Sequence, residues 1–397
     1  MSLRVFVSPL RYVQGPDALS QIGEQLQLLG IKNPLILVSR SAKKAVGSTI
    51  TQSLTHKGIR YAFIDFGGES TWKEIERIKD ACIQGEHDAV INCGGGKTLD
   101  TGRCAAAGAA TNVMKVPPEV FARFGAGVPC INVPTVAATD GATSSLSLVH
   151  TEEGTLEAIM VSTTNPLMVM VDTAVIARSP VRLLVAGMGD ALSTYFEADM
   201  CYRTSSPSTS TRALSTRTAQ VLARLCFDIL MDYGVQAKIE TEAGVPGPGL
   251  EAVTEANVLL SGLGFQSGGL SAAHAVGTAF EHVSEAFQQP PFHGEAVGFG
   301  TLVQLLLEAR EPRFLDKIFG FCKAVGLPTT FEELSLKNVS DQTLETVANV
   351  ASRAIQMRSM TGASKVPDEE GRFYDDRAIL NALKATDTYG RSFAVRP

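Results

Sequence analysis

Three side chains in the second half of the chain are of the types that hold divalent metal ions. Asp190 lies in the otherwise apolar stretch VAGMGDALSTYF, where burying an unpaired carboxylate would be costly. His274 lies in the small-residue pattern SGGLSAAHAVGTAFEHV, and His293 comes directly before the helical pattern GEAVGFGTLVQLLLEA. Two imidazoles about twenty residues apart can meet one ion across a helix corner, and coordination would offset the cost of the buried acid. The alternative is separate structural roles, with His282 as a competing ligand that lies roughly 80° further around the helix than His274.

A second group of residues could hold a phosphate. The apolar run DAVINC leads into Gly94, Gly95, Gly96, Lys97 and Thr98, and the helical pattern TLDTGRCAAAGAA follows. Glycines let backbone N–H groups approach an anion closely, and the start of the helix adds a partial positive charge. The spacing is neither GxGxxG nor the P-loop pattern, so a plain tight turn is the alternative. We interpret the segment as a cradle for the pyrophosphate of a dinucleotide.

The apolar periodicity predicts the elements that must position these groups. Over residues 1–178, short apolar runs alternate with helical stretches, which indicates parallel βαβ units in a doubly wound sheet. Beyond this point apolar residues recur at helical spacing, and Ser179 with Pro180 forms a good N-cap and first-turn pair. We therefore predict an α/β dinucleotide-binding domain with a parallel sheet over 1–178 and an all-α domain over 179–397. The expected strands are 34–39, 61–66, 88–93, 130–136 and 167–172.

Length and composition exclude several classes of protein. A chain of 397 residues exceeds what one hydrophobic core usually serves, which also favours two domains. The formal net charge of −6, without a dense run of Lys and Arg, argues against nucleic acid as a partner. No segment has the roughly 18 uninterrupted apolar residues of a membrane span. Seven cysteines without a CxxC pair indicate reduced thiols, so we expect a cytoplasmic protein.

Several longer motifs carry a family resemblance: GGGKTLDT (94–101), VPTVAATDGATSSLS (133–147), GMGDALSTYFEA (187–198), GLGFQSGGLSAAHAVG (262–277), FHGEAVGFGTL (292–302) and ATDTYG (385–390). They resemble the glycerol dehydrogenases within the iron-containing alcohol dehydrogenase superfamily. The resemblance implies the dehydroquinate synthase-like architecture, with one zinc ion per subunit in the cleft between two domains. Asp190, His274 and His293 match the family's metal ligands. Many iron-type relatives have a further histidine where this chain has Thr194, which fits the zinc-type branch, with iron as the alternative.

The resemblance also assigns cofactor and substrate contacts. Asp140, in ATDGATSS, matches a catalytic acid that lies near the nicotinamide and binds substrate hydroxyls, and a turn-forming Asp-Gly is the alternative. The family usually has a tyrosine where this chain has His150, and commonly an acid where it has Ser39-Arg40-Ser41. An acid there favours NAD, whereas an arginine can accommodate the 2′-phosphate of NADP. We expect NAD, bound by Ser39, Gly94, Gly95, Gly96, Lys97, Thr98, Asp100, Thr135, Ser144, Leu146 and His150.

The implied reaction is NAD-dependent oxidation of glycerol, or a related vicinal diol, to a hydroxyketone such as dihydroxyacetone. Two adjacent hydroxyls could chelate the metal ion, which eases loss of the alcohol proton before hydride passes to the nicotinamide. The closest rival is a dehydroquinate-synthase-like lyase acting on a phosphorylated sugar acid, but no cluster of basic residues stands near the three metal ligands. An NADP-dependent polyol dehydrogenase and a non-enzymatic scaffold are further alternatives. The family suggests a homo-oligomer, with an octamer as one form, and gives no purpose for the long segment 111–130.

Overall fold

The computed structural model describes residues 3–108, 110–112, 121–122, 125–337, 339–356 and 374–393. The chain divides into two compact units. The sheet unit contains Ser8–Ser179 and Glu240–Gly262, and the helical unit contains Met1–Val7, Pro180–Ile239 and Leu263–Pro397. The chain passes from the sheet unit to the helical unit after Ser179, beside the expected boundary at 178, but residues 240–262 return to the sheet unit. The assignment of separate roles to 1–178 and 179–397 stays a prediction.

Six parallel strands form the main sheet, in the order β1-β10-β7-β4-β2-β3. The strands are β1 (Arg11–Gly15), β2 (Pro34–Val38), β3 (Ala62–Asp65), β4 (Ala89–Gly94), β7 (Cys130–Pro134) and β10 (Met168–Asp172). In the central register, Cys93 of β4 lies opposite Val38 of β2 and Val133 of β7. All five expected strands are therefore present, and β1 is an additional strand that the sequence did not indicate.

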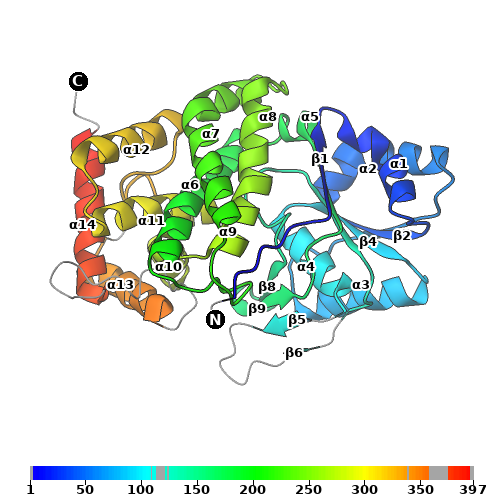
Figure 1. The fold of residues 1–397 in the computed structure, drawn as a ribbon, viewed down its shortest axis with the longest axis horizontal. Helices are drawn as coiled ribbons and strands as arrows, with labels where there is room; N and C mark the ends of the chain where they lie inside the picture. The colour runs from blue at the N-terminus through cyan, green and yellow to red at the C-terminus, as the bar shows by residue number, and fades with distance from the viewer. Residues whose placement is uncertain are drawn as a thin grey trace. The chain divides into compact units, whose positions relative to one another are not determined.

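Helices cover both faces of this sheet (Figure 1). The helices of the sheet unit are η1 (Ala18–Gln21), α1 (Ile22–Leu28), α2 (Arg40–His56), α3 (Trp72–Gln84), α4 (Gly96–Ala106), α5 (Thr173–Ile176), α8 (Pro248–Glu255) and the π turn η2 (Ala256–Leu260). Successive strand residues point to opposite faces. Ile36 and Ile91 pack in the core beside α1 and α2, whereas Leu35 and Val90 pack beside α3 and α4. Burial on both faces explains why these strands read as continuous apolar runs.

A second, antiparallel sheet has the order β6-β5-β9-β8. Its strands are β5 (Ala110–Asn112), β6 (Phe121–Ala122), β8 (Leu146–His150) and β9 (Leu156–Ser162). The sequence did not predict this sheet. Within the long segment 111–130, the structure describes residues of β5, β6 and 125–130, and the rest lies outside the described residues.

The helical unit contains no strand among its described residues, which confirms the all-α prediction. Its helices are α6 (Val181–Arg203), α7 (Arg217–Glu242), α9 (Ser261–Gly268), α10 (Ala272–Ala279), η3 (Phe280–Ala286), α11 (His293–Leu307), α12 (Pro312–Val325), α13 (Asp341–Gln356) and α14 (Asp376–Phe393). No described helix is long and apolar enough to span a membrane. The expected N-cap at Ser179 is wrong: Pro180, with an extended ψ of 125°, occupies the cap position, so α6 begins one residue later.

Candidate functional site

The three predicted metal ligands come from three helices of the helical unit. Asp190 lies in α6, His274 lies in α10, and His293 is the first residue of α11. Nε2 of His274 is 3.4 Å from Oδ1 of Asp190, and Nε2 of His293 is 3.7 Å from the same oxygen. Ligand atoms that share a tetrahedral ion at about 2.1 Å lie about 3.4 Å from one another. The donor set and its spacing therefore fit one divalent ion.

Glycines allow the three helices to approach this closely. A Cβ atom at Gly294 of α11 would come 1.8 Å from the carbonyl oxygen of Ala186 in α6. One at Gly300 would come 2.2 Å from the carbonyl oxygen of Ala273 in α10. Such separations are far below any normal contact, so side chains at these positions would force the helices apart. The glycines in HGEAVGFG thus explain how a helix start and two helix interiors meet at one point.

The burial of the cluster is graded. Asp190 is 3% exposed, whereas the side chain of His293 is 36% exposed and opens the cluster to one side. Burial opposes the charged form of His274, but the charges of Glu197 and Asp190 and the hydrogen bonds to both outweigh it and hold the pKa of His274 well above its usual value. A proton and a metal ion compete for the same ring nitrogen, so ion binding here would release protons.

A buried carboxylate that the sequence reasoning missed stands behind His274. Oε2 of Glu197 is 2.6 Å from Nδ1 of the imidazole. Glu197 lies seven residues after Asp190 in α6, which is two helical turns, so both acids project from the same helix face. This spacing within an apolar helix was the available sequence signal. The pair resembles the carboxylate–histidine–metal arrangements that orient ligating imidazoles.

The start of α11 is held by a second acid, Glu295. Its Oε2 accepts the backbone N–H of Phe292 at 2.8 Å, which caps the helix that His293 begins. Arg182 donates to both Glu295 oxygens at 2.6 and 2.8 Å and lies 4.7 Å from the Phe292 ring centroid. The glutamate of the HGE motif therefore fixes the helix end from which His293 projects.

Two other positions bear on the ligand set. His282 is exposed and does not belong to the cluster. Thr194 is buried one helical turn after Asp190, and a Cβ at Gly264 of α9 would come 2.5 Å from its Cγ2. Thr194 is thus packed tightly against α9, and three protein ligands converge here among the described residues.

The phosphate-loop residues lie at the switch point of the parallel sheet. The chain leaves β2 toward β3 on one side and leaves β4 toward β7 on the other, and ligands of open α/β sheets bind at such a point. A Cβ at Gly96 would meet no atom within 4 Å, and one at Gly95 would meet only Val136, at 3.9 Å. Open space thus faces the first turn of α4, whose leading N–H groups have no partner within the helix. This cradle fits a pyrophosphate.

Of the remaining predicted cofactor residues, Ser39, Thr98 and Thr135 lie beside Gly94 of this loop. Ser39 caps α2, and its Oγ would lie 3.0 Å from a Cβ at Gly94. The backbone N–H of Thr135 donates to the carbonyl of Gly94 at 3.1 Å. Ser144 is buried and accepts the N–H of Leu146 at 3.4 Å. Thr98 is buried in the first turn of α4.

A fully buried arginine ties the loop helix to the segment that follows β7. Arg103 of α4 donates to the backbone carbonyls of Gly141 and Leu146, and to Oγ of Ser147 at 3.0 Å. It also pairs with Asp100 at 3.1 Å. Burial raises the pKa of Asp100 to about 6, although Arg103 opposes the shift. Arg103 therefore positions two predicted cofactor contacts, Asp100 and Leu146, and the sequence reasoning missed it.

His150 and Arg40, the two positions that depart from the expected pattern, have different surroundings. His150 lies in β8, and its Nδ1 is 3.3 Å from Oε1 of Glu69, whose other oxygen pairs with Lys97. Partial burial opposes ionisation of Glu69, but Lys97, the Ser70 N–H and His150 together lower its pKa. Arg40 is the exposed first residue of α2. His150 therefore belongs to a charged group that includes the phosphate-loop lysine.

Asp140 lies in the loop between β7 and β8. Its Oδ2 accepts a hydrogen bond from Ser261 Oγ at 2.8 Å, and its carbonyl accepts the N–H of Thr143 at 3.0 Å. Thr143 Oγ1 also donates to the carbonyl of Val258 at 2.7 Å, and Asn257 donates to Ala137 at 3.0 Å. The Asp140 loop is thus held by the π turn η2 and the residue after it, and also by Arg103 of α4.

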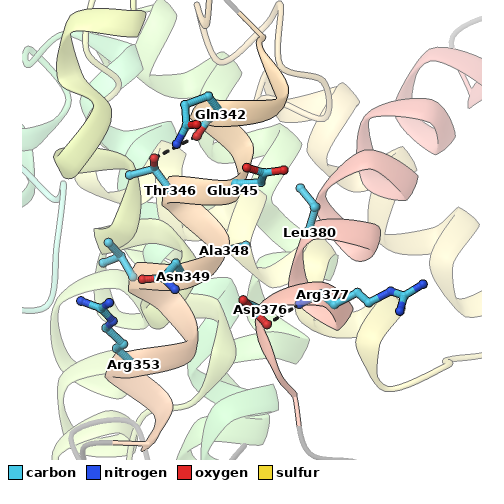
Figure 2. A pocket seen from close by; sticks show the side chains of 10 residues that line it. Gln342, Glu345, Thr346, Ala348, Asn349, Arg353, Asp376, Arg377 and Leu380 are labelled. Atoms are coloured by element: carbon cyan, nitrogen blue, oxygen red, sulfur yellow. Dashed lines mark hydrogen bonds between the residues drawn. The ribbon is translucent and has the colours of Figure 1, made fainter.

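A separate hollow of about 610 Å³ lies along α13 and α14 (Figure 2). Glu345 and Arg353 line it from α13, and Asp376 and Arg377 line it from the start of α14. Its lining residues include no histidine or cysteine, and none is shared with the metal cluster. The hollow is therefore separate from the metal cluster, and its ionisable lining groups are carboxylates and guanidinium groups.

Comparisons with known proteins agree with this geometry. The sequence pattern of the family described as iron-containing alcohol dehydrogenase matches residues 9–173. A glycerol dehydrogenase of Thermotoga maritima is 37% identical over 97% of this chain and 97% of its own length. The chain belongs to the iron-containing alcohol dehydrogenase family. Two solved structures extend the likeness: a probable glycerol dehydrogenase from Sinorhizobium meliloti (TM-score 0.83, 33% identity, 98% of this chain and 100% of that chain) and the glycerol dehydrogenase of Schizosaccharomyces pombe (TM-score 0.85, 31% identity, 99% and 92%).

Membership of the iron-containing alcohol dehydrogenase family confirms the resemblance from which the ligand set was predicted. The structure brings Asp190, His274 and His293 together in the helical unit. It places Gly94, Gly95 and Gly96 where β4 ends and α4 begins, at the switch point of the main sheet. The iron-containing alcohol dehydrogenase name does not fix the ion, because nitrogen and oxygen donors suit both iron and zinc.

Proposed function

We propose that this protein is an NAD-dependent glycerol dehydrogenase that oxidises glycerol, or a related vicinal diol, to a hydroxyketone. The observation that carries the proposal is the convergence of Asp190, His274 and His293 at one point, in a chain that is similar along 97% of its length to a glycerol dehydrogenase. A dehydroquinate-synthase-like lyase, an NADP-dependent enzyme and a scaffold are not favoured, because full-length relatives are glycerol dehydrogenases.

We assign one zinc ion per subunit to the cluster, held by Oδ1 of Asp190 and Nε2 of His274 and His293. When bound, the ion acts as a Lewis acid that eases loss of the proton from a substrate hydroxyl. Three protein ligands, with Thr194 in place of a fourth, would leave one position of a tetrahedral ion open, and expansion to five ligands would admit two neighbouring hydroxyls. The exposed edge of His293 is the side from which a small polyol would enter. The choice of zinc over iron rests on the resemblance to the zinc-type branch.

We assign NAD to the loop of the sheet unit, with its pyrophosphate at Gly95 and Gly96 and the first turn of α4. The carboxylate of Asp140, held at one oxygen by Ser261, would accept a hydrogen bond from a substrate hydroxyl. A nicotinamide cofactor bound there would supply the acceptor for the hydride. Gly95, Gly96 and Asp140 would thus orient the cofactor and the substrate relative to each other and supply the hydrogen bonds and charge around them.

We also propose a cytoplasmic homo-oligomer. All seven cysteines are free thiols, which suits a reducing compartment. Val221, Leu225 and Ile239 lie on one face of α7, and Val221 is 66% exposed. An apolar stripe on a long helix suits contact with another subunit. Sedimentation analysis would give the number of subunits, and a strictly monomeric protein would contradict this part of the proposal.

The experiment that tests the function follows NADH absorbance when purified protein meets NAD and glycerol. The same assay is run after chelator treatment, after zinc or ferrous iron addition, and with NADP or 1,2-propanediol as replacements. We expect reduction of NAD that the chelator abolishes and zinc restores. Iron restoring activity better than zinc would correct the metal, and no reduction of either cofactor with any polyol would refute the function.

A further inference from the structure

We propose that Glu197 is a positioning residue that fixes the tautomer of His274 and so sets the affinity of the metal site. The inference rests on the proposed function only in taking Asp190, His274 and His293 as metal ligands. Glu197 is fully buried in α6, among helices of the same unit. A carboxylate removed from water to this degree is costly unless its oxygens are satisfied, so its contacts define what it does.

Both oxygens of Glu197 are committed to α10. Oε1 accepts the backbone N–H groups of Ser271 at 2.8 Å and His274 at 2.9 Å. These are donors at the start of α10 that the helix itself leaves without partners. Oε2 accepts from Nδ1 of the His274 ring at 2.6 Å. One acid on α6 therefore caps α10 from a neighbouring helix and holds the imidazole that α10 carries.

The chemistry of these contacts determines which ring nitrogen faces the metal. An ionised carboxylate can only accept hydrogen bonds, so Nδ1 must carry the proton. In the neutral ring the lone pair is then on Nε2, the atom 3.4 Å from Asp190 Oδ1. A carboxylate partner also makes the imidazole a stronger ligand. Glu197 thus keeps the Nδ1 proton in place, so that Nε2 is the ring nitrogen that exchanges its proton for an ion.

Glutamine at position 197 would keep the shape and lose this effect. With its NH₂ group toward Nδ1, the amide would require the ring proton on Nε2, where it blocks the metal. With its oxygen toward Nδ1, the NH₂ group would face the N–H groups of Ser271 and His274, and donors would meet donors. Neither orientation satisfies all three contacts, so Glu197→Gln should weaken metal binding without changing side-chain volume.

A nearby buried glutamine provides a matched control. Oε1 of Gln304, in α11, accepts the backbone N–H of Ala273 at 2.9 Å, so it also caps α10, and its side chain is fully buried. No hydrogen bond joins Gln304 to the imidazole among the described contacts. Gln304→Met should therefore weaken the α10 cap and leave the tautomer of His274 unchanged.

The test measures zinc affinity on metal-free protein by competition with a coloured chelator, with thermal unfolding in excess chelator as a measure of folding. We expect Glu197→Gln to bind zinc about 10- to 100-fold more weakly than wild type. The zinc affinity of Gln304→Met should stay within about threefold of the wild-type value. This should hold even if its unfolding temperature falls as much as that of Glu197→Gln. If Glu197→Gln does not fold, carboxylate and amide are compared instead in the shorter side chains of Glu197→Asp and Glu197→Asn. The Glu197→Asp protein should then bind zinc more tightly than the Glu197→Asn protein.

Three results would overturn the inference. Wild-type affinity in Glu197→Gln would show that the carboxylate does not set the tautomer. Equal losses in Glu197→Gln and Gln304→Met would reduce Glu197 to a helix cap. If the wild-type protein oxidises glycerol and binds zinc, either result leaves the proposed function standing. A wild-type protein that binds neither zinc nor ferrous iron would instead refute the metal site, and the role of Glu197 with it.

Discussion

Replacing Gly294 with alanine should separate two helices that carry metal ligands. The added Cβ would lie 1.8 Å from the carbonyl oxygen of Ala186 and 3.2 Å from the backbone nitrogen of Asp190. A carbon–oxygen contact needs about 3.3 Å, so α11 must move from α6 by about 1.5 Å beside His293. Metal–ligand distances tolerate only about 0.2 Å. We therefore expect losses on the order of 100-fold in zinc affinity and in turnover of glycerol.

Gly298→Ala is the control, because it lies one turn further along the same helix. Its Cβ would lie 3.2 Å from the Cα of Gly189, which a shift of a few tenths of an ångström relieves. Zinc competition and NADH formation would be measured for both variants, with circular dichroism to verify folding. Wild-type zinc affinity in a folded Gly294→Ala protein would refute the view that helix separation sets the ligand geometry. Equal losses in the two variants would refute it as well.

Three further predictions concern the sheet unit. Burial raises the pKa of Asp100 from its ordinary value of 3.8 to about 6, so the stability that its neutral form contributes is fully present below pH 4 and is lost as the pH rises through 6. Relative to Asp100→Asn, the free energy of urea unfolding should fall by about 3 kcal/mol over that interval, and a flat difference would contradict the shift. Arg40→Asp should raise the preference for NAD over NADP in kcat/KM at least about tenfold, since a carboxylate accepts a ribose hydroxyl and repels a 2′-phosphate; an unchanged ratio would remove Arg40 from the site. Ser261→Ala removes one hydrogen bond to Asp140, worth about 1 kcal/mol, and should lower kcat/KM for glycerol about fivefold without changing NAD affinity.

The main sheet could be predicted because its strands are buried on both faces. All residues of β2, β4 and β10 are buried, so each reads as an unbroken apolar run. The second sheet gave no such signal, since β5 and β6 have three and two residues and β8 alternates between buried and partly buried positions. Residues 240–262 have a helical pattern, and periodicity alone does not state which unit a helix joins.

The metal ligands could be predicted because each departs from its surroundings, as a charged or imidazole group among apolar and small residues. Glu197 and Arg103 could not be assigned roles from sequence in the same way. Their partners lie far away in the chain: Glu197 contacts His274, 77 residues on, and Arg103 contacts Leu146, 43 residues on. The pairing of such buried groups is decided by which helices pack together, and that information is not local.

Glycine has two opposite uses in this chain, and only the structure separates them. At Gly95 and Gly96 the missing side chain leaves open space in which a ligand's phosphate can approach the backbone. At Gly294 and Gly300 the same absence is already filled by the carbonyl of a neighbouring helix. A side chain at Gly95 or Gly96 would therefore obstruct cofactor binding and leave the fold intact. A side chain at Gly294 or Gly300 would displace a helix and thereby disturb the metal ligands. Similar glycine-rich motifs thus serve recognition in one unit and ligand placement in the other.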